Sequence, residues 1–305
     1  MKIKKTVIIT GYRCNNYCEF CYNDRKKRNL PEMSTGDILR EIYNACSRGS
    51  TYLELIGGEL TMRPDLQDIV SSAKSVGFKN ISITTNGRMF SYKRFANKII
   101  KSGLTDLVFS IHGHCAKLHD SLTRVKGSFD QLFSGINNVK EIGGCNVGSN
   151  TTIVKKNYVF LPEIGKFISS IGIRNSEFIF VDPTKGLAKK NFMSIVPRIS
   201  LVAPYVHRCL DLAKLNNFNH WHIRYVPVCY FLSYQNQISE IQEARTFLPE
   251  HIAPDFKNFN VAQSRQSLAR IKPAKCRTCS KYNICEGIWK EYYFYYGSKE
   301  LKPIK

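Results

Sequence analysis

The sequence alternates short apolar segments with helix-length segments from its N-terminus to about residue 216. This alternation is typical of a parallel α/β fold, because a parallel strand needs a long crossover before its neighbour. Six units of about 36 residues each fit a partial barrel related to the TIM architecture. The expected strands are 6–10, 52–56, 80–85, 106–111, 147–153 and 177–181, and the expected helices are 35–48, 66–75, 92–102, 128–142, 161–171 and 197–216. The chain is therefore expected to form a TIM-like (β/α)6 partial barrel.

The alternation stops near residue 217, and the remaining sequence is rich in cysteine and tyrosine. We therefore expect two domains, a barrel over residues 1–216 and a small cysteine-rich domain over residues 217–305. Between residues 235 and 274 the periodicity is weak, and the sequence predicts no particular element there.

The composition is that of an ordinary globular chain, with 43% hydrophobic and 23% charged residues among 305. No window reaches the apolar length that a transmembrane helix requires. The N-terminus runs into the first expected strand without a cleavable signal, so a cytoplasmic protein is expected.

Lysine and arginine exceed aspartate and glutamate by 45 − 24 = 21. A surface with this excess attracts polyanions or acidic partners. RNA binding and a basic host proteome explain the charge equally well. Lysine and arginine are locally in excess at residues 25–28 and in roughly the last fifty residues. Neither segment resembles a nucleic-acid-binding module.

Three cysteines, Cys14, Cys18 and Cys21, lie on one short loop after the first expected strand, with the spacing CxxxCxxC. Three thiolates can hold three corners of a cubane iron–sulfur cluster, whereas a closed cluster takes four. The spacing therefore predicts a cluster with one iron open to another ligand. Eleven cysteines without an export signal also favour metal binding over disulfides.

Three further strings follow the next strands, and the C-terminal ends of barrel strands form one mouth. They are Gly57-Gly58-Glu59, Thr85-Asn86-Gly87 and Ser110-Ile111-His112-Gly113. A glycine pair lets the backbone approach a ligand closely, and a neighbouring carboxylate can pair with an ammonium group. An amino-acid-bearing cofactor requires both.

The cysteine loop with Phe20, the Gly-Gly-Glu string and the segment from Ser110 to Phe129 together resemble radical SAM enzymes. The resemblance implies that Cys14, Cys18 and Cys21 bind a [4Fe-4S] cluster whose open iron chelates S-adenosylmethionine (SAM). Many members carry an arginine where Thr123 stands here, and Arg124 is its neighbour. The implied cofactor-binding residues are Gly57, Gly58, Glu59, Asn86, Ser110, Arg124 and Asn150.

Cys115 lies in the loop after the fourth strand, near the expected mouth, and is the one catalytic candidate, as a hydrogen-atom donor. His112, His114 and His119 are close to it in sequence. A histidine in such a loop more often bonds locally, so none of the three is assigned a catalytic role.

A second cysteine set consists of Cys276, Cys279 and Cys285, preceded by Cys229. Four cysteines can close a metal site completely. The continuation Gly287-Ile288-Trp289 resembles the SPASM and twitch extensions that hold auxiliary [4Fe-4S] clusters. A full SPASM domain would have a further cysteine where Trp289 stands, so one auxiliary cluster is expected. A zinc ribbon is the alternative, and Cys209 is an alternative ligand to Cys229.

The resemblance implies an oxidoreductase or transferase-type enzyme that reductively cleaves SAM to a 5′-deoxyadenosyl radical and abstracts hydrogen from a C–H bond. An external flavodoxin-like or ferredoxin-like protein would supply the electron. Modification of a ribosomally made, acidic peptide is the leading expectation, although the chain starts at the first strand, without room for a leader-binding domain. The alternatives are oxidation or epimerisation of a sugar or nucleoside, including a phosphorylated one, and RNA modification. A zinc-stabilised nucleic-acid-binding protein is the non-enzymatic alternative.

Overall fold

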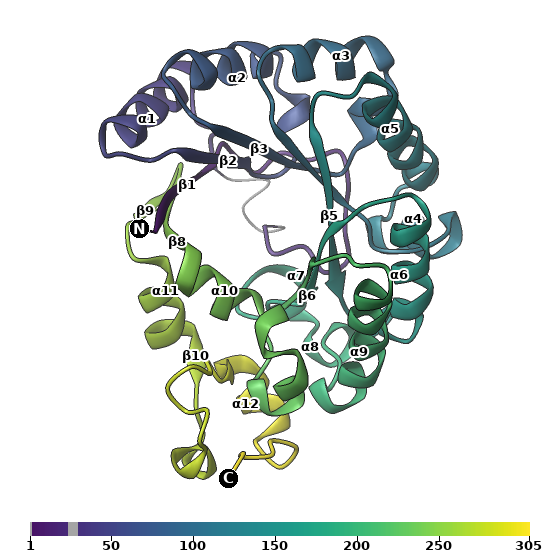
Figure 1. Cartoon of the computed structure of the whole chain (residues 1–305), viewed down its shortest axis with the longest axis vertical. Helices are drawn as coiled ribbons and strands as arrows, with labels where there is room; N and C mark the ends of the chain where they lie inside the picture. The colour runs from purple at the N-terminus through teal and green to yellow at the C-terminus, as the bar shows by residue number, and fades with distance from the viewer. Residues whose placement is uncertain (1, 24–29) are drawn as a thin grey trace.

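The computed structural model describes residues 2–23 and 30–305, and in this part of the chain nine strands form one sheet curved into a ring (Figure 1). The strand order is β7-β6-β5-β4-β3-β2-β1-β8-β9. Strands β1 to β6 are Ile3–Ile9, Tyr52–Ile56, Asn80–Thr85, Asp106–Ser110, Asn146–Ile153 and Asn175–Phe180, all paired in parallel. The predicted α/β partial barrel is confirmed. The basic string at residues 25–28 lies outside the described residues.

The larger helices cover the outside of the ring (Figure 1). The larger ones are α1 (Thr35–Ser47), α2 (Leu66–Ser75), α3 (Lys93–Lys101), α5 (Ser128–Ile142), α6 (Leu161–Ser170) and α9 (Ile199–Leu215). The shorter ones are α4 (Ala116–Thr123), α7 (Gly186–Lys190), α8 (Phe192–Ile195), α10 (Ser239–Thr246), α11 (Val261–Ser264) and α12 (Lys290–Tyr296). The predicted helices are present within a few residues of their expected bounds. None of the described helices has the length and apolar character needed to cross a membrane.

Buried and partly buried side chains alternate along the strands, and this alternation separates the outer face of the sheet from the lumen. Leu53 and Leu55 of β2 are fully buried, whereas Tyr52, Glu54 and Ile56 are only partly buried. Successive strand residues point to opposite faces, so the leucines pack under the helices and Glu54 faces the lumen. The helices therefore cover an apolar outer face, and the inner face is free to carry polar groups.

The sheet extends past residue 216, where the sequence predicted that the alternation would stop. Strand β7 (His220–Arg224) is parallel to β6, β8 (Phe247–Ala253) is parallel to β1, and β9 (Phe256–Asn258) is antiparallel to β8. These strands were not predicted because they carry charged or polar lumen residues, such as Arg224 in β7, and lack an apolar run. The two-domain division itself stays a prediction.

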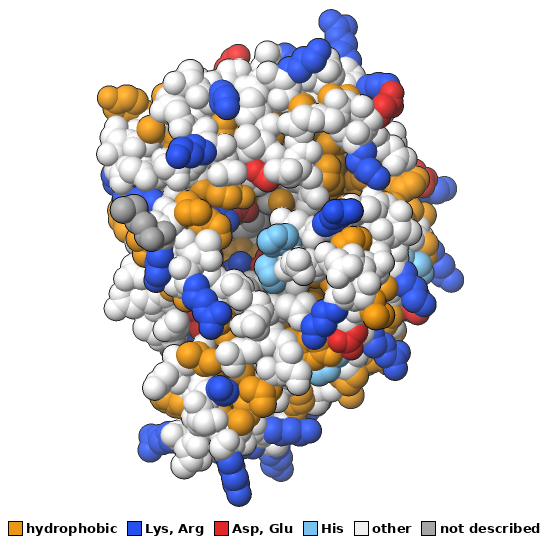
Figure 2. Space-filling view, in the orientation of Figure 1, with side chains coloured by type: hydrophobic (Ala, Val, Ile, Leu, Met, Phe, Trp, Pro, Cys, Tyr) orange, Lys and Arg blue, Asp and Glu red, His pale blue; other side chains and the backbone are white. Residues whose placement is uncertain are grey.

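The lumen is polar. Lys5 on β1 lies 2.6 Å from Glu54, and Arg224 lies 2.8 Å from Glu177 and 3.3 Å from Glu243. Burial alone would lower the pKa of Lys5, but the Glu54 carboxylate overrides it and raises that pKa. Figure 2 shows a hollow at the centre of this face, with histidine side chains at its rim and charged groups deeper inside.

The C-terminal segment packs beside one part of the ring, at the bottom of Figure 1. It contains a two-stranded antiparallel sheet of β10 (Arg270–Ile271) and β11 (Ile288–Trp289), followed by α12. Tyr292 of α12 is fully buried, and its hydroxyl accepts a hydrogen bond from the backbone N–H of Ile199 at the start of α9. The last helix is therefore fixed to the barrel.

Candidate functional site

The first cysteine loop follows β1, and its backbone is bonded to the end of α4. The N–H groups of Tyr17 and Glu19 donate to the carbonyls of Thr123 and Leu122, each at 2.9 Å. All three thiols, of Cys14, Cys18 and Cys21, are partly buried. The predicted three-cysteine set therefore lies on one loop with a fixed backbone.

Residues after β3 hold the same loop from another side. The Asn86 amide donates to Asn15 Oδ1 at 2.6 Å and lies 3.9 Å from the Cys14 sulfur. The Arg88 guanidinium donates to the Asn15 carbonyl at 2.6 Å and to Asn16 Oδ1 at 3.2 Å. The structure thus brings Asn86 to the cysteines, as predicted. Arg88 was missed, although it directly follows the Thr85-Asn86-Gly87 string.

The glycine pair after β2 allows two loops to approach each other. A Cβ at Gly58 would lie 1.9 Å from the carbonyl oxygen of Arg13, and one at Gly57 would lie 2.6 Å from that of Gly11. Two backbone hydrogen bonds, from Gly58 to Gly11 and from Glu59 to Arg13, form across this contact. The close approach that the glycines permit is therefore to the start of the cysteine loop.

Glu59 is 4% exposed, and protein groups occupy both oxygens of its carboxylate. One oxygen accepts hydrogen bonds from the Thr61 and Thr85 hydroxyls, both at 2.6 Å, and the other accepts from the Asn86 N–H at 2.7 Å. Burial raises the pKa of this carboxyl, while these donors lower it. The Glu59 side chain thus ties β2 to β3, and its expected pairing with a ligand ammonium group stays a prediction.

Ser110 and Asn150 are adjacent partners on β4 and β5, and both are partly buried. Ser110 is the last residue of β4, whereas Asn150 lies in the middle of β5. Arg124 differs, because it is exposed in the left-handed backbone conformation that ends α4. Its neighbour Thr123 is buried and bonds both the cysteine loop and Ser128. Arg124 is therefore exposed beside the contact between Thr123 and the cysteine loop, and its cofactor role stays a prediction.

Two of the three histidines have local structural roles. His112 Nδ1 accepts a hydrogen bond from the Thr152 N–H, and His119 Nδ1 accepts one from the His112 N–H. The two rings are stacked, and Phe20 of the cysteine loop packs edge-on against His112, with ring centres 4.9 Å apart. Burial lowers the pKa of His112 to about 3 and that of His119 to about 4. Both rings are thus neutral and support the cysteine loop by packing. Cys115 directly precedes α4, and its role as a hydrogen-atom donor stays a prediction.

The second cysteine set lines one cavity, which contains Cys229, Cys276, Cys279 and Cys285. Backbone N–H groups point at these sulfurs, from Val228 and Gly287 to Cys285 and from Ile304 to Cys279, at 3.3 to 3.5 Å. Burial and the neighbouring thiols raise the pKa of Cys229 and of Cys276. In a site of four thiols with such donors, the ligand chemistry fits an iron–sulfur cluster.

Cys209, the alternative to Cys229, lies inside α9 and donates to the Leu161 carbonyl at 3.1 Å, away from this cavity. Across residues 2–23 and 30–305, no three His, Cys, Asp or Glu side chains meet closely enough to hold a single metal ion.

The family model of the Radical SAM superfamily matches residues 8–164 of the chain, which include the cysteine loop and the strings after β2, β3 and β4. The chain belongs to the radical SAM superfamily. Membership implies a [4Fe-4S] cluster, SAM and an electron donor, and it favours an enzyme over the zinc-stabilised alternative.

Among sequence relatives, a probable GTP 3′,8-cyclase of Saccharolobus solfataricus is 30% identical over 224 residues, covering 72% of this chain and 69% of the relative. A second probable GTP 3′,8-cyclase, from Saccharolobus islandicus, is 29% identical over 216 residues, covering 70% of this chain and 67% of the relative.

Solved radical SAM structures share the fold over nearly the whole chain. SuiB of Streptococcus suis bound to the precursor peptide SuiA has a TM-score of 0.69 at 18% identity, covering 96% of this chain and 73% of SuiB. The enzyme anSMEcpe with bound AdoMet and a peptide has a TM-score of 0.68 at 13% identity, covering 99% and 92%. At these identities the likeness is one of fold.

Proposed function

We propose that Cys14, Cys18 and Cys21 hold the superfamily's [4Fe-4S] cluster and that the loops around them bind SAM. The observation that carries this proposal is that hydrogen bonds from the ends of β2, β3 and α4 all hold the one loop that contains the three cysteines. When bound, the cluster and SAM would supply one-electron cleavage of SAM and hydrogen abstraction from a substrate C–H bond. The chain's own groups position the pair.

The cofactor-binding residues divide into two kinds under this proposal. Ser110 and Asn150, adjacent at the mouth, face SAM directly, and Asn86 lies beside Cys14. Gly57 and Gly58 hold the start of the cysteine loop through close backbone contacts, and Glu59, whose carboxylate accepts hydrogen bonds from Thr61, Thr85 and Asn86, lies beside that loop. Arg124 reaches the cofactor only if its side chain turns inward from its exposed position.

We also propose that Cys229, Cys276, Cys279 and Cys285 hold a second [4Fe-4S] cluster in a twitch-like segment. Four thiols around one cavity support it, and so do the N–H groups aimed at the sulfurs, because hydrogen bonds to sulfur stabilise and tune such clusters. Zinc is the alternative, and iron analysis separates the two.

For the substrate we propose a peptide. The likeness to two peptide-bound structures supports it, since it extends over the C-terminal segment as well as the barrel. A nucleotide is the second candidate, favoured by the sequence likeness to probable GTP 3′,8-cyclases. An acidic peptide and a nucleotide are both attracted by the net charge of +21, so charge does not separate them.

The test uses the full chain, purified and reconstituted without oxygen. With a flavodoxin or a chemical reductant and SAM, it should form 5′-deoxyadenosine, and absence of the product would overturn the proposed function. Substrates are then compared by how much they stimulate this product. GTP is one arm, and short acidic peptides encoded beside the gene are the other.

A further inference from the structure

Buried polar atoms without a hydrogen-bond partner gather in one place in the described part of the chain. Five of the six such side-chain atoms come from four residues where the C-terminal segment meets the barrel. They are Glu240 Oε2, Arg270 Nε, Arg270 Nη1, Trp289 Nε1 and Glu291 Oε2. Buried polar groups in folded proteins nearly always have a partner, so this concentration requires an explanation.

Arg270 is at the centre of this group. Its side chain is 1% exposed, and its guanidinium stacks on the Trp289 ring, 3.6 Å from the ring centre. Its one carboxylate contact is with Glu240, 3.4 Å away, and the same Glu240 oxygen accepts a hydrogen bond from the Tyr225 N–H at 2.7 Å. Stacking on a ring leaves the in-plane N–H groups of a guanidinium available to another partner.

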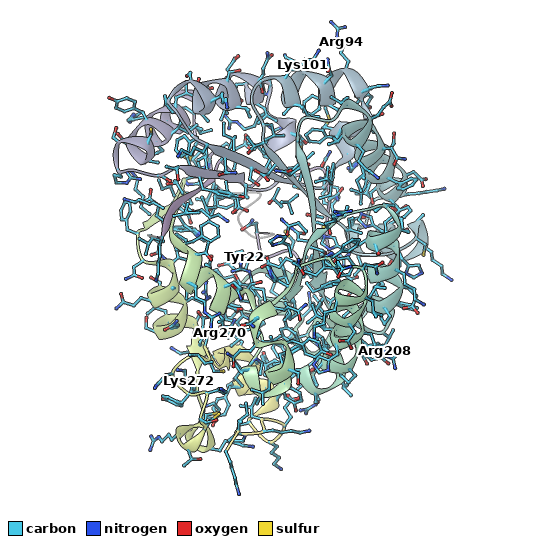
Figure 3. All side chains as sticks on the ribbon, viewed as in Figure 1. Tyr22, Arg94, Lys101, Arg208, Arg270 and Lys272 are labelled. Atoms are coloured by element: carbon cyan, nitrogen blue, oxygen red, sulfur yellow. The ribbon has the colours of Figure 1, made fainter. Side chains whose placement is uncertain are left out.

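The group lies at the barrel mouth, between the two cysteine sites. Asp182 lies two residues after the end of β6 and interacts electrostatically with both Arg270 and Glu291. Tyr22, next to Cys21, interacts with Asp182 and Tyr225 in turn. Figure 3 shows Tyr22 inside the ring of strands and Arg270 between it and Lys272 of the C-terminal segment.

The surrounding side chains connect this group to solvent. Tyr22 is 40% exposed, and Asp182 and Tyr225 are partly buried, whereas Arg270 and Glu240 are buried beneath them. Tyr22, Asp182 and Tyr225 are therefore the more accessible neighbours of the buried Arg270 group.

The unpartnered atoms define the chemistry of a ligand. Three are N–H donors and two are carboxylate oxygens. A carboxylate would satisfy the donors but would lie beside Glu240 and Glu291, and an ammonium group would satisfy the acceptors but would lie beside Arg270. A neutral amide, with C=O and N–H side by side, satisfies both kinds without adding a buried charge. Its flat shape also suits the aromatic surfaces of Tyr225 and Trp289.

We propose that Arg270, Trp289, Glu240 and Glu291 form a substrate-recognition site that binds an amide edge. This inference rests on the proposed function, because it places the substrate beside the first cysteine loop. The amide edge belongs either to a peptide or to the lactam of a nucleobase such as guanine.

The test exploits the fact that the chain has only two tryptophans, Trp221 and Trp289. The reconstituted enzyme is labelled with 5-fluorotryptophan and followed by ¹⁹F NMR, and Trp221→Phe assigns the two resonances. Trp221 is the internal reference, since its indole N–H already donates to the Ile173 carbonyl at 3.2 Å. The probes are a capped acidic peptide, GTP, acetate and methylammonium.

The site predicts a saturable shift of the Trp289 resonance alone, with the peptide or with GTP, and the responding probe identifies the source of the amide. A response to acetate or methylammonium but to neither amide would overturn the proposed chemistry. No response to any probe would overturn the site, as expected if ordered water alone satisfies these atoms.

Two variants provide an independent check. Arg270→Gln should raise the dissociation constant of the responding probe about tenfold or more, because a charged donor is lost. Trp289→Phe keeps an aromatic ring but removes one N–H and the ¹⁹F reporter itself, so binding to the variants is measured by titration calorimetry. This variant should raise the constant about threefold to tenfold, whereas the matched Trp221→Phe should leave it unchanged. Unchanged binding in Trp289→Phe would contradict the proposal even if Arg270→Gln fails to fold.

Iron content and 5′-deoxyadenosine formation without substrate are measured on the same samples. If the unmodified enzyme contains no iron or forms no 5′-deoxyadenosine, the proposed function is refuted. Normal values with an unresponsive Trp289 would refute only the recognition site.

Discussion

The two cysteine sites differ in what completes them. Cys14, Cys18 and Cys21 lie on a loop held from outside, by Asn86 and Arg88 after β3 and by the end of α4. The other four thiols line their own cavity, and the chain's last residues help to enclose it, since Leu301 and Pro303 line it and Ile304 donates to Cys279. Under the proposed function, the first arrangement leaves a coordination position for a ligand, and the second supplies four protein ligands. The first site would then be suited to reaction and the second to a closed cluster.

The largest effect is expected at the open site. Cys18→Ala should abolish 5′-deoxyadenosine formation, by about a thousandfold or more, because two thiolates cannot retain the cluster. Product is measured by chromatography after reduction with SAM present. Cys145→Ser is the matched control, as its thiol lies near the start of β5, and it should keep full activity. Persistent activity in Cys18→Ala would break the distinction between the two sites.

Removing a ligand of the closed site should have a different outcome. Cys279→Ala should lower iron from about eight to about four atoms per chain and leave much of the uncoupled SAM cleavage, since the two clusters are bound separately. Iron and sulfide are measured on anaerobic samples. Cys209→Ser, which changes a thiol outside the cavity, should keep about eight. About four irons and one zinc in the unmodified chain would instead favour the zinc ribbon.

Acid should destabilise the fold around the first cysteine loop, because His112 and His119 pack there as neutral rings. Their pKa values of about 3 and about 4 lie below the ordinary 6.5, so the unfolded chain takes up these protons first and folding stability falls as pH drops below about 6.5. From pH 7 to 5 the loss is about 3–4 kcal/mol for the pair at most. It is measured as the free energy of unfolding against pH.

His119→Asn is the comparison for the acid effect, because its side-chain oxygen can accept the same bond from the His112 N–H. This variant should lose about half of the pH dependence. An unchanged slope would show that these rings do not carry the effect.

The smallest effect is expected from the chain's end. Deleting residues 304 and 305 removes the N–H that Ile304 donates to Cys279 and should destabilise the closed site by about 1 kcal/mol. Thermal unfolding and the reduction potential of the second cluster report this change. Lys305→Ala, which keeps Ile304, is the control. Equal behaviour of the two variants would mean that the tail does not support this site.

The sequence predicted the elements whose pattern is local. Strands β2 and β3 have the expected bounds, because alternation and β-branched residues specify a strand that packs under helices. Strands β7 and β8 were missed because Arg224 and His251 face a polar lumen, and the carboxylates that pair with Arg224 come from other segments of the chain. Such pairs have no signature in a single stretch of sequence.

The site residues follow the same rule. The three cysteines and Asn86 could be located because strand ends in a parallel barrel meet at one mouth. The partners of the Glu59 carboxylate could not, since Thr61 and Thr85 become donors only after β2 and β3 pair. Arg270 could not be singled out from the sequence either, because its proposed role depends on side-chain atoms that have no hydrogen-bond partner in the folded chain.

The parallel pairing of β1 with β8 has a consequence for the order of assembly. Residues 3–8 bond with residues 247–252, so the strand that leads into the first cysteine loop remains an unprotected edge until most of the chain has been synthesised. We therefore expect iron to be inserted at Cys14, Cys18 and Cys21 after translation. A chain ending at residue 216 should retain little iron there, and full occupancy in that fragment would show that loading can begin on the ribosome.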